Sequence, residues 1–149
     1  MQRIEKHVII DALRSAVWEA LTNPSSIRQW MGGPEMRIEI SSDWTVAGPL
    51  LITGFHHVAF QNKGTILRVE PEHILCYTQL SSLSRLPDEP QNYATLCFEL
   101  AAAAARTSVT LTVDNFPTEA IFKHLNFYWS TTLAVLKKFV EQHPAIGDA

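Results

Sequence analysis

The sequence has no long hydrophobic run. Its apolar stretch at residues 101–105 is far shorter than the roughly 20 residues that a membrane-spanning helix needs. Near the N-terminus, only Val8, Ile9 and Ile10 precede Asp11, whereas a secretory signal needs about 7–15 apolar residues. We therefore expect no membrane span and a cytoplasmic location.

Cysteine, histidine and glycine are sparse and do not form known motifs. The two cysteines, Cys76 and Cys97, are not in a CxxC spacing, so we expect free thiols in a reducing compartment. The six histidines include no HxxxH pattern, and the six glycines form no phosphate-binding loop. The sequence therefore predicts neither a metal nor a cofactor.

Charge is also low. Charged residues make up 18% of the chain, the net charge is -3 and the pI is about 6.0, so a basic surface for nucleic acid is not expected. Hydrophobic residues make up 46%, which is enough for a packed core. With no linker and no repeat, residues 1–149 are predicted to form a single domain.

What is present is an ordered series of strand and helix patterns. A strand over 3–10 precedes two short helices over 13–22 and 25–31, which Asp11 and Asn23 are expected to cap. A long helix over 118–142 closes the chain. The six strand-like runs between them are 36–41, 49–57, 64–69, 74–80, 93–100 and 107–113, with a loop over 81–91 and a hairpin connection at 101–105.

The last strands and the long helix have complementary apolar faces. Leu96, Phe98 and Leu100 alternate with polar residues, as do the apolar residues of 107–113. The long helix repeats its apolar residues at spacings of three and four: Phe122, Leu125, Trp129, Leu133, Leu136 and Val140. The pattern predicts an α+β fold, in which a curved antiparallel sheet of about seven strands wraps around the C-terminal helix.

The run VIIDALRSAVWEALTNPSSIRQWM, at residues 8–31, resembles the opening of the START-like, helix-grip superfamily, also called SRPBCC. Within it, the sequence is most similar to the branch of homologues of the activator of heat-shock protein 90 ATPase. Asp43-Trp44 with Gly48, then Gly64-Thr-Ile-Leu, Pro71, ILCYTQ and TLCFEL, continue the resemblance over about 3–142. Leu13, Pro49, Arg68 and Gln79 depart from the family pattern near the expected pocket, so the resemblance does not transfer a particular ligand.

The resemblance implies a cavity between the sheet and the long helix, and a small apolar molecule as the partner. Fold alone does not identify the ligand. The residues expected to line the cavity are Trp30, Phe55, His56, His57, Tyr77, Gln79, Phe98, Phe122, Leu125 and Trp129.

Some of these residues carry open alternatives. Adjacent strand residues point to opposite faces, so either His56 or His57 is expected to face the cavity. Tyr77 and Gln79 share one face, and supply specific hydrogen bonds only if that face is the inner one. The aromatic residues fit core packing as well as ligand contact.

Three functions remain from different classes. The first is a binding protein for an apolar ligand with no catalytic residues, because the sequence has no GxSxG motif and no recognisable Cys–His pair. The second is an enzyme of the polyketide cyclase or aromatase type, acting through His56 or His57 with Tyr77. The third is a chaperone ATPase activator. A chaperone partner is not expected, because such activators carry a further N-terminal domain and this sequence starts at the first helix-grip strand. A homodimer through the outer sheet face is compatible with the pattern.

Overall fold

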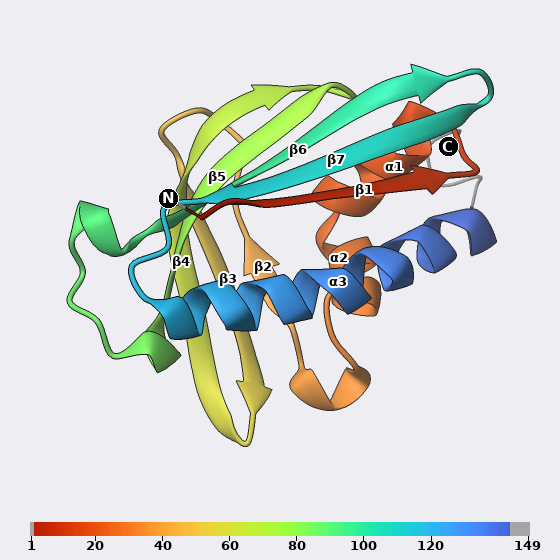
Figure 1. Cartoon of the computed structure of the whole chain (residues 1–149). Helices are drawn as coiled ribbons and strands as arrows, with labels where there is room; N and C mark the ends of the chain where they lie inside the picture. Colours follow the sequence, from red (N-terminus) through yellow and green to blue (C-terminus); the bar gives the residue numbers. More distant parts are fainter. Residues whose placement is uncertain (1, 144–149) are drawn as a thin grey trace.

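The computed structural model describes residues 2–143 and forms one seven-stranded antiparallel sheet. Its strand order is β1-β7-β6-β5-β4-β3-β2 (Figure 1). The first strand therefore pairs with the last, and each strand from β2 to β6 pairs with the next one in the sequence. The strands are β1 (Ile4–Ile10), β2 (Glu39–Ser41), β3 (Pro49–His56), β4 (Val58–Glu70), β5 (Ile74–Ser81), β6 (Ala94–Ala103) and β7 (Arg106–Asp114).

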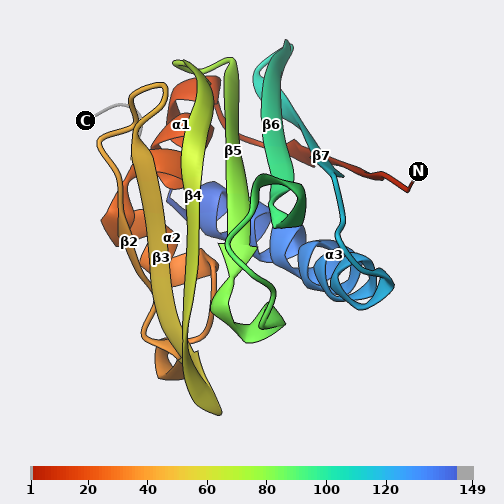
Figure 2. The same cartoon turned by 90° about the vertical axis from the view of Figure 1, so that its left-hand side faces the viewer.

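Three α-helices cover one face of this sheet. They are α1 (Arg14–Thr22), α2 (Pro24–Trp30) and the long α3 (Glu119–Gln142). Figure 2 shows the curved sheet with the helices on its concave side, and α3 running obliquely across the layer. This architecture confirms the predicted α+β helix-grip fold, including the two short helices that follow the first strand.

Local sequence explains most helix starts. The Asn23 side chain accepts a hydrogen bond from the backbone N–H of Ser25 at 2.8 Å, and Pro24 takes the first position of α2, as predicted. The Thr118 hydroxyl caps α3 by accepting from the N–H of Ile121 at 3.2 Å. The predicted cap of α1 is wrong, because Leu13 occupies that position and makes no side-chain cap.

The core lies between the sheet and the helices. On β6 and β7, the predicted alternation is confirmed: Leu96, Phe98 and Leu100 are buried, as are Val109, Leu111 and Val113. On α3, the residues at helical spacing are buried too, except for Phe122, which is half-buried. The two periodicities therefore meet in one apolar layer.

Two turns differ from the prediction because they use residues that rarely form turns. The β3–β4 turn falls at His57, which has φ 64°, so β4 starts at Val58 rather than at residue 64. The β6–β7 turn includes Ala104 with φ 59°, so β6 continues through Ala103. In both hairpins a strand extends beyond its predicted end, because no glycine or asparagine marks the position of the turn.

The prediction of free thiols is wrong in this structure. Cys76 and Cys97 lie directly opposite each other on β5 and β6 and form a disulfide. Neither sequence spacing nor composition showed this pairing, because it depends on the register of the two strands. The bond lies on the outer face of the sheet, since the neighbouring Leu75 and Phe98 point inward.

None of the helices in residues 2–143 is both long and apolar enough to cross a membrane. Residue 1 and residues 144–149, which the predicted single domain includes, lie outside the described part of the chain.

Candidate ligand-binding site

Four aromatic side chains from four different elements meet at the centre of the layer. Trp30 comes from α2, Tyr77 from β5, Phe98 from β6 and Trp129 from α3. The ring of Phe98 packs edge-on against Trp129 with centroids 5.5 Å apart, and Trp30 lies 6.3 Å from Trp129. Tyr77 stacks with Phe98 at 6.3 Å. These contacts join the sheet to both α2 and α3.

A residual cavity of about 10 Å³ remains beside this aromatic cluster. Such a volume holds about one water molecule, so the layer is filled by side chains in this structure. Tyr77 is the residue with an ionisable group in its wall. The other residues that line it are Leu21, Ile27, Trp30, Met31, Ile40, Trp44, Leu50, Leu75 and Phe98.

The Tyr77 phenol is buried in apolar surroundings. Burial raises its pKa well above the ordinary value, the nearby Tyr128 phenol raises it further, and no hydrogen bond contributes. The hydroxyl therefore stays protonated at physiological pH. It can donate a hydrogen bond to a ligand, but it cannot act as a general base there.

The second buried phenol, Tyr128 on α3, already has a partner. Its hydroxyl donates to the backbone carbonyl of Met31 at 2.5 Å, which ties α3 to the end of α2. Burial raises the pKa of Tyr128 to about 12. The indole of Trp30 is satisfied in the same way, because its Nε1–H donates to the carbonyl of Ala20 at 2.8 Å. Both groups therefore hold the helices in place.

Burial falls off towards one end of the layer, which we call the hairpin end and define by Gly54, Phe60, Asn62 and Gln79. All four residues are half-buried, and the strand registers place them on the inner face of β3, β4 and β5. In Figure 2, β3 and β4 stand on the opposite side of the layer from the first turns of α3. Residues at the other end, such as Val17 and Leu136, are fully buried.

Comparison with known proteins adds to this geometry. A family model described as "Activator of Hsp90 ATPase homolog 1-like protein" matches residues 11–141. The chain belongs to this family. No curated protein matches it closely enough to add an activity.

Solved structures share the fold of this Activator of Hsp90 ATPase homolog 1-like chain. A Cytophaga hutchinsonii protein is 35% identical, with 96% of each chain covered and a TM-score of 0.79. The Aha1 dimer from Colwellia psychrerythraea is 20% identical over 95% of this chain and 97% of that chain, with a TM-score of 0.74. CalU16 from Micromonospora echinospora is 22% identical over 98% and 81%, with a TM-score of 0.72. The last two show the fold alone.

In this family member, most residues predicted to line a site lie in the layer. Trp30, Tyr77, Phe98 and Trp129 form the central cluster, and Gln79 lies at the hairpin end. On α3, Leu125 is buried, and half-buried Phe122 packs edge-on against Phe116 at 5.0 Å. The open question about Tyr77 and Gln79 is answered, since their shared face is the inner one.

Three predicted residues lie elsewhere. Phe55, His56 and His57 are exposed at the tip of the β3–β4 hairpin, where the centroids of the two imidazole rings are 4.8 Å apart. The expectation that one histidine faces the cavity is wrong, because both lie at the exposed hairpin tip, beyond the residues that line the cavity. Phe55 instead borders an open depression of about 590 Å³ along the hairpin, together with Arg37 and Phe60.

One residue of this site was missed by the sequence reasoning. Asn62 precedes the predicted start of its strand, yet it lies on the inner face of β4 opposite Ile52. The alternation of Phe60, Asn62 and Ile66 was the available signal, and it was hidden by placing the turn too late in the sequence. Within residues 2–143, no group of three or more potential metal ligands comes together.

Proposed function

We propose that this chain binds a small, largely apolar molecule in the layer between the sheet and α3. The observation that carries the proposal is the Tyr77 phenol, which lies at the centre of the layer, in the wall of an aromatic-lined cavity. A ligand oxygen that accepts a hydrogen bond from this hydroxyl would gain a specific contact in apolar surroundings.

Binding requires the layer to open, because about 10 Å³ is too small for any ligand larger than water. The hairpin end is the proposed entrance, since its inward-facing residues are only half-buried. The fully buried end around Val17 and Leu136 would stay closed.

No catalysis is included in the proposal. A cyclase-type reaction needs a group that takes or gives a proton at the ligand, and the histidines considered for that role are exposed at the hairpin tip. Tyr77 remains, as a protonated donor. A chaperone-activating role stays an alternative, and a pull-down with purified chaperone tests it.

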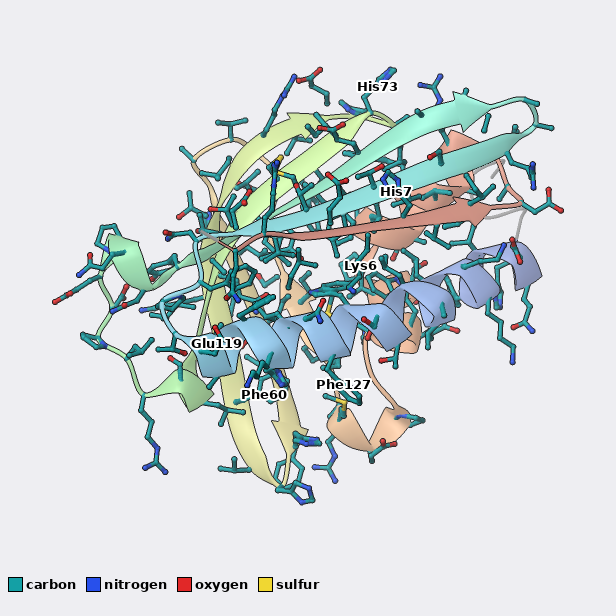
Figure 3. The ribbon with its side chains drawn as sticks, viewed as in Figure 1. Lys6, His7, Phe60, His73, Glu119 and Phe127 are labelled. Atoms are coloured by element: carbon teal, nitrogen blue, oxygen red, sulfur yellow. A yellow bond between two sulfur atoms is a disulfide. The ribbon has the colours of Figure 1, made fainter. Side chains whose placement is uncertain are left out.

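The test is a thermal-shift screen with sterols, fatty acids, flavonoids, polyketides and apolar amines. A ligand at about 100 times its Kd stabilises by about 2.7 kcal/mol, which raises the Tm of a domain of this size by several degrees. Ile40→Phe should abolish the shift, because Ile40 is half-buried and lines the residual cavity. Phe127→Ala is the control, since Phe127 points away from the layer on the solvent side of α3 (Figure 3).

A hit whose shift survives in Ile40→Phe would place binding outside the layer and contradict the proposal. A hit that is lost in Ile40→Phe and kept in Phe127→Ala would support it. Because both variants alter apolar side chains, the comparison separates the site from general surface hydrophobicity. A panel without any hit would move attention to protein partners.

A homodimer remains a separate prediction. The Colwellia protein is described as a dimer, and in this chain Phe55 and Leu67 are each 46% exposed on the sheet. Sedimentation of the purified protein over a range of concentrations would test it. Phe55→Ser should lower the dimer fraction if this face is the contact.

A further inference from the structure

Asn62 has a buried polar atom with no partner. Among the described residues, its Oδ1 is the one buried side-chain oxygen or nitrogen atom that makes no hydrogen bond. The residue lies on the inner face of β4, opposite Ile52 on β3 and Ser81 on β5. The unsatisfied oxygen therefore belongs to the layer between the sheet and the helices.

An unpaired buried acceptor is unfavourable, and native proteins rarely keep one without a reason. The inward positions of β4 on either side of Asn62 are Phe60, Gly64 and Ile66, none of which has a polar side chain. Leucine at this position would fill a similar volume without the cost of an unpaired oxygen. The strand thus holds one polar inward group among apolar neighbours.

Asn62 and Tyr77 lie at different places along the inner face of the sheet. Tyr77 lies opposite Ile66. Asn62 precedes Ile66 by four residues on β4, which corresponds to about 13 Å along the strand toward the hairpin. Asn62 is therefore at the hairpin end, whereas Tyr77 is at the centre of the layer. Half-buried Gln79 shares the inner face between them. In Figure 3, Phe60, the inward neighbour of Asn62 on β4, marks this part of the molecule.

We propose that Asn62 is a specificity residue that accepts a hydrogen bond from the polar end of the ligand. The inference rests on the proposed function and names the chemical class: an amphipathic molecule with an apolar body and a terminal hydroxyl or N–H group. A hydrocarbon leaves Oδ1 unpaired, and a carboxylate presents an acceptor to another acceptor. Both are disfavoured at this position.

The experiment uses three probes with the same apolar body: 1-hydroxypyrene, pyrene and 1-pyrenecarboxylate. Their dissociation constants are measured by fluorescence titration against the full chain and against Asn62→Leu. One hydrogen bond contributes about 1 kcal/mol, so the preference for 1-hydroxypyrene over pyrene should fall about fivefold in Asn62→Leu. Asn126→Leu is the matched control, because Asn126 is exposed on α3, and it should keep the wild-type preference.

The unliganded variants separate this role from a structural one. If Asn62 serves only ligand recognition, Asn62→Leu should melt at or above the wild-type temperature, because it removes an unpaired buried acceptor. An unchanged preference for 1-hydroxypyrene in Asn62→Leu would overturn the inference while leaving the proposed function standing, and so would tighter binding of the carboxylate. Binding of none of the three probes to the wild-type chain would overturn the inference, whereas the thermal-shift screen decides the proposed function.

Discussion

The ammonium group of Lys137 lies 2.6 Å from Oε2 of Glu141, one turn further along α3. The same ammonium donates to the backbone carbonyl of Ile9 at 2.7 Å, and Oε2 also accepts from the backbone N–H of Asp11 at 2.7 Å. The pair therefore joins the last turns of α3 to the end of β1. Hydrogen bonds from Lys137 and from the Asp11 backbone lower the pKa of the Glu141 carboxyl.

Replacing Glu141 by glutamine should make the stability of the protein less dependent on acid pH. A carboxyl with a lowered pKa in the folded state stabilises fully above its ordinary value of 4.5 and loses that contribution as the pH falls through its folded pKa. The Tm of the wild type should therefore exceed that of Glu141→Gln between pH 7 and about pH 5, and the difference should shrink below 4.5. A difference that grows towards acid pH would contradict the assignment.

The two buried phenols should respond differently to loss of the hydroxyl group. Tyr128→Phe removes the hydrogen bond to the Met31 carbonyl and should lower the free energy of unfolding by about 1–2 kcal/mol. Tyr77→Phe removes a hydroxyl with no such bond, so the free energy should change by less than about 0.5 kcal/mol. Urea denaturation of both variants gives the comparison. Equal losses would show that Tyr77 has a structural partner.

Reduction of the Cys76–Cys97 bond should destabilise the protein without unfolding it. The bond closes a loop with a sequence separation of 21, for which the loss of chain entropy corresponds to about 3 kcal/mol. Urea denaturation with and without reductant measures the difference, and the double variant Cys76→Ser/Cys97→Ser should be insensitive to reductant. Alkylation of the cysteines in intact cells would test the cytoplasmic prediction at the same time, because stable disulfides are rare in reducing compartments. Complete labelling with no loss of stability on reduction would show that the bond has no structural role.

Gly64 should not tolerate a side chain. A Cβ atom at this position would lie 1.6 Å from the backbone carbonyl oxygen of Thr78, where β4 and β5 approach each other beside an irregularity in their pairing. Gly64→Ala should therefore lower the free energy of unfolding by more than about 2 kcal/mol. Gly33→Ala is the control, because the atoms it meets belong to the flexible side chain of Glu35. Similar Tm values for the two variants would disprove the close approach.

Much of the fold followed from periodicity, because burial imposes it. The alternation on β6 and β7 and the spacing on α3 gave the inner face correctly, so Phe98 and Trp129 could be expected to meet, whereas the face taken by Tyr77 stayed open. The turns were less predictable. His57 and Ala104 both take positive φ without being glycine or asparagine, so nothing in their chemistry marked the ends of the strands.

The errors in the site come from these turns and from register. Placing the turn too late put His56 and His57 inside the sheet and left Asn62 outside a strand. The disulfide was missed for a different reason: both cysteines were assigned to strands, but only the pairing of β5 with β6 sets them opposite each other. From a single sequence, the sheet face of a residue is easier to predict than its partner on the neighbouring strand.

The pairing of β1 with β7 also bears on how the chain is made. Ile4 lies opposite Val113, and Lys137 holds the carbonyl of Ile9. During synthesis the first strand therefore has no partner until β7, which begins at Arg106, has left the ribosome. Pairings between distant segments slow folding, and the apolar face of β1 stays uncovered in the meantime. We expect the nascent chain to depend on holding factors, and the sheet to close late and in one cooperative step.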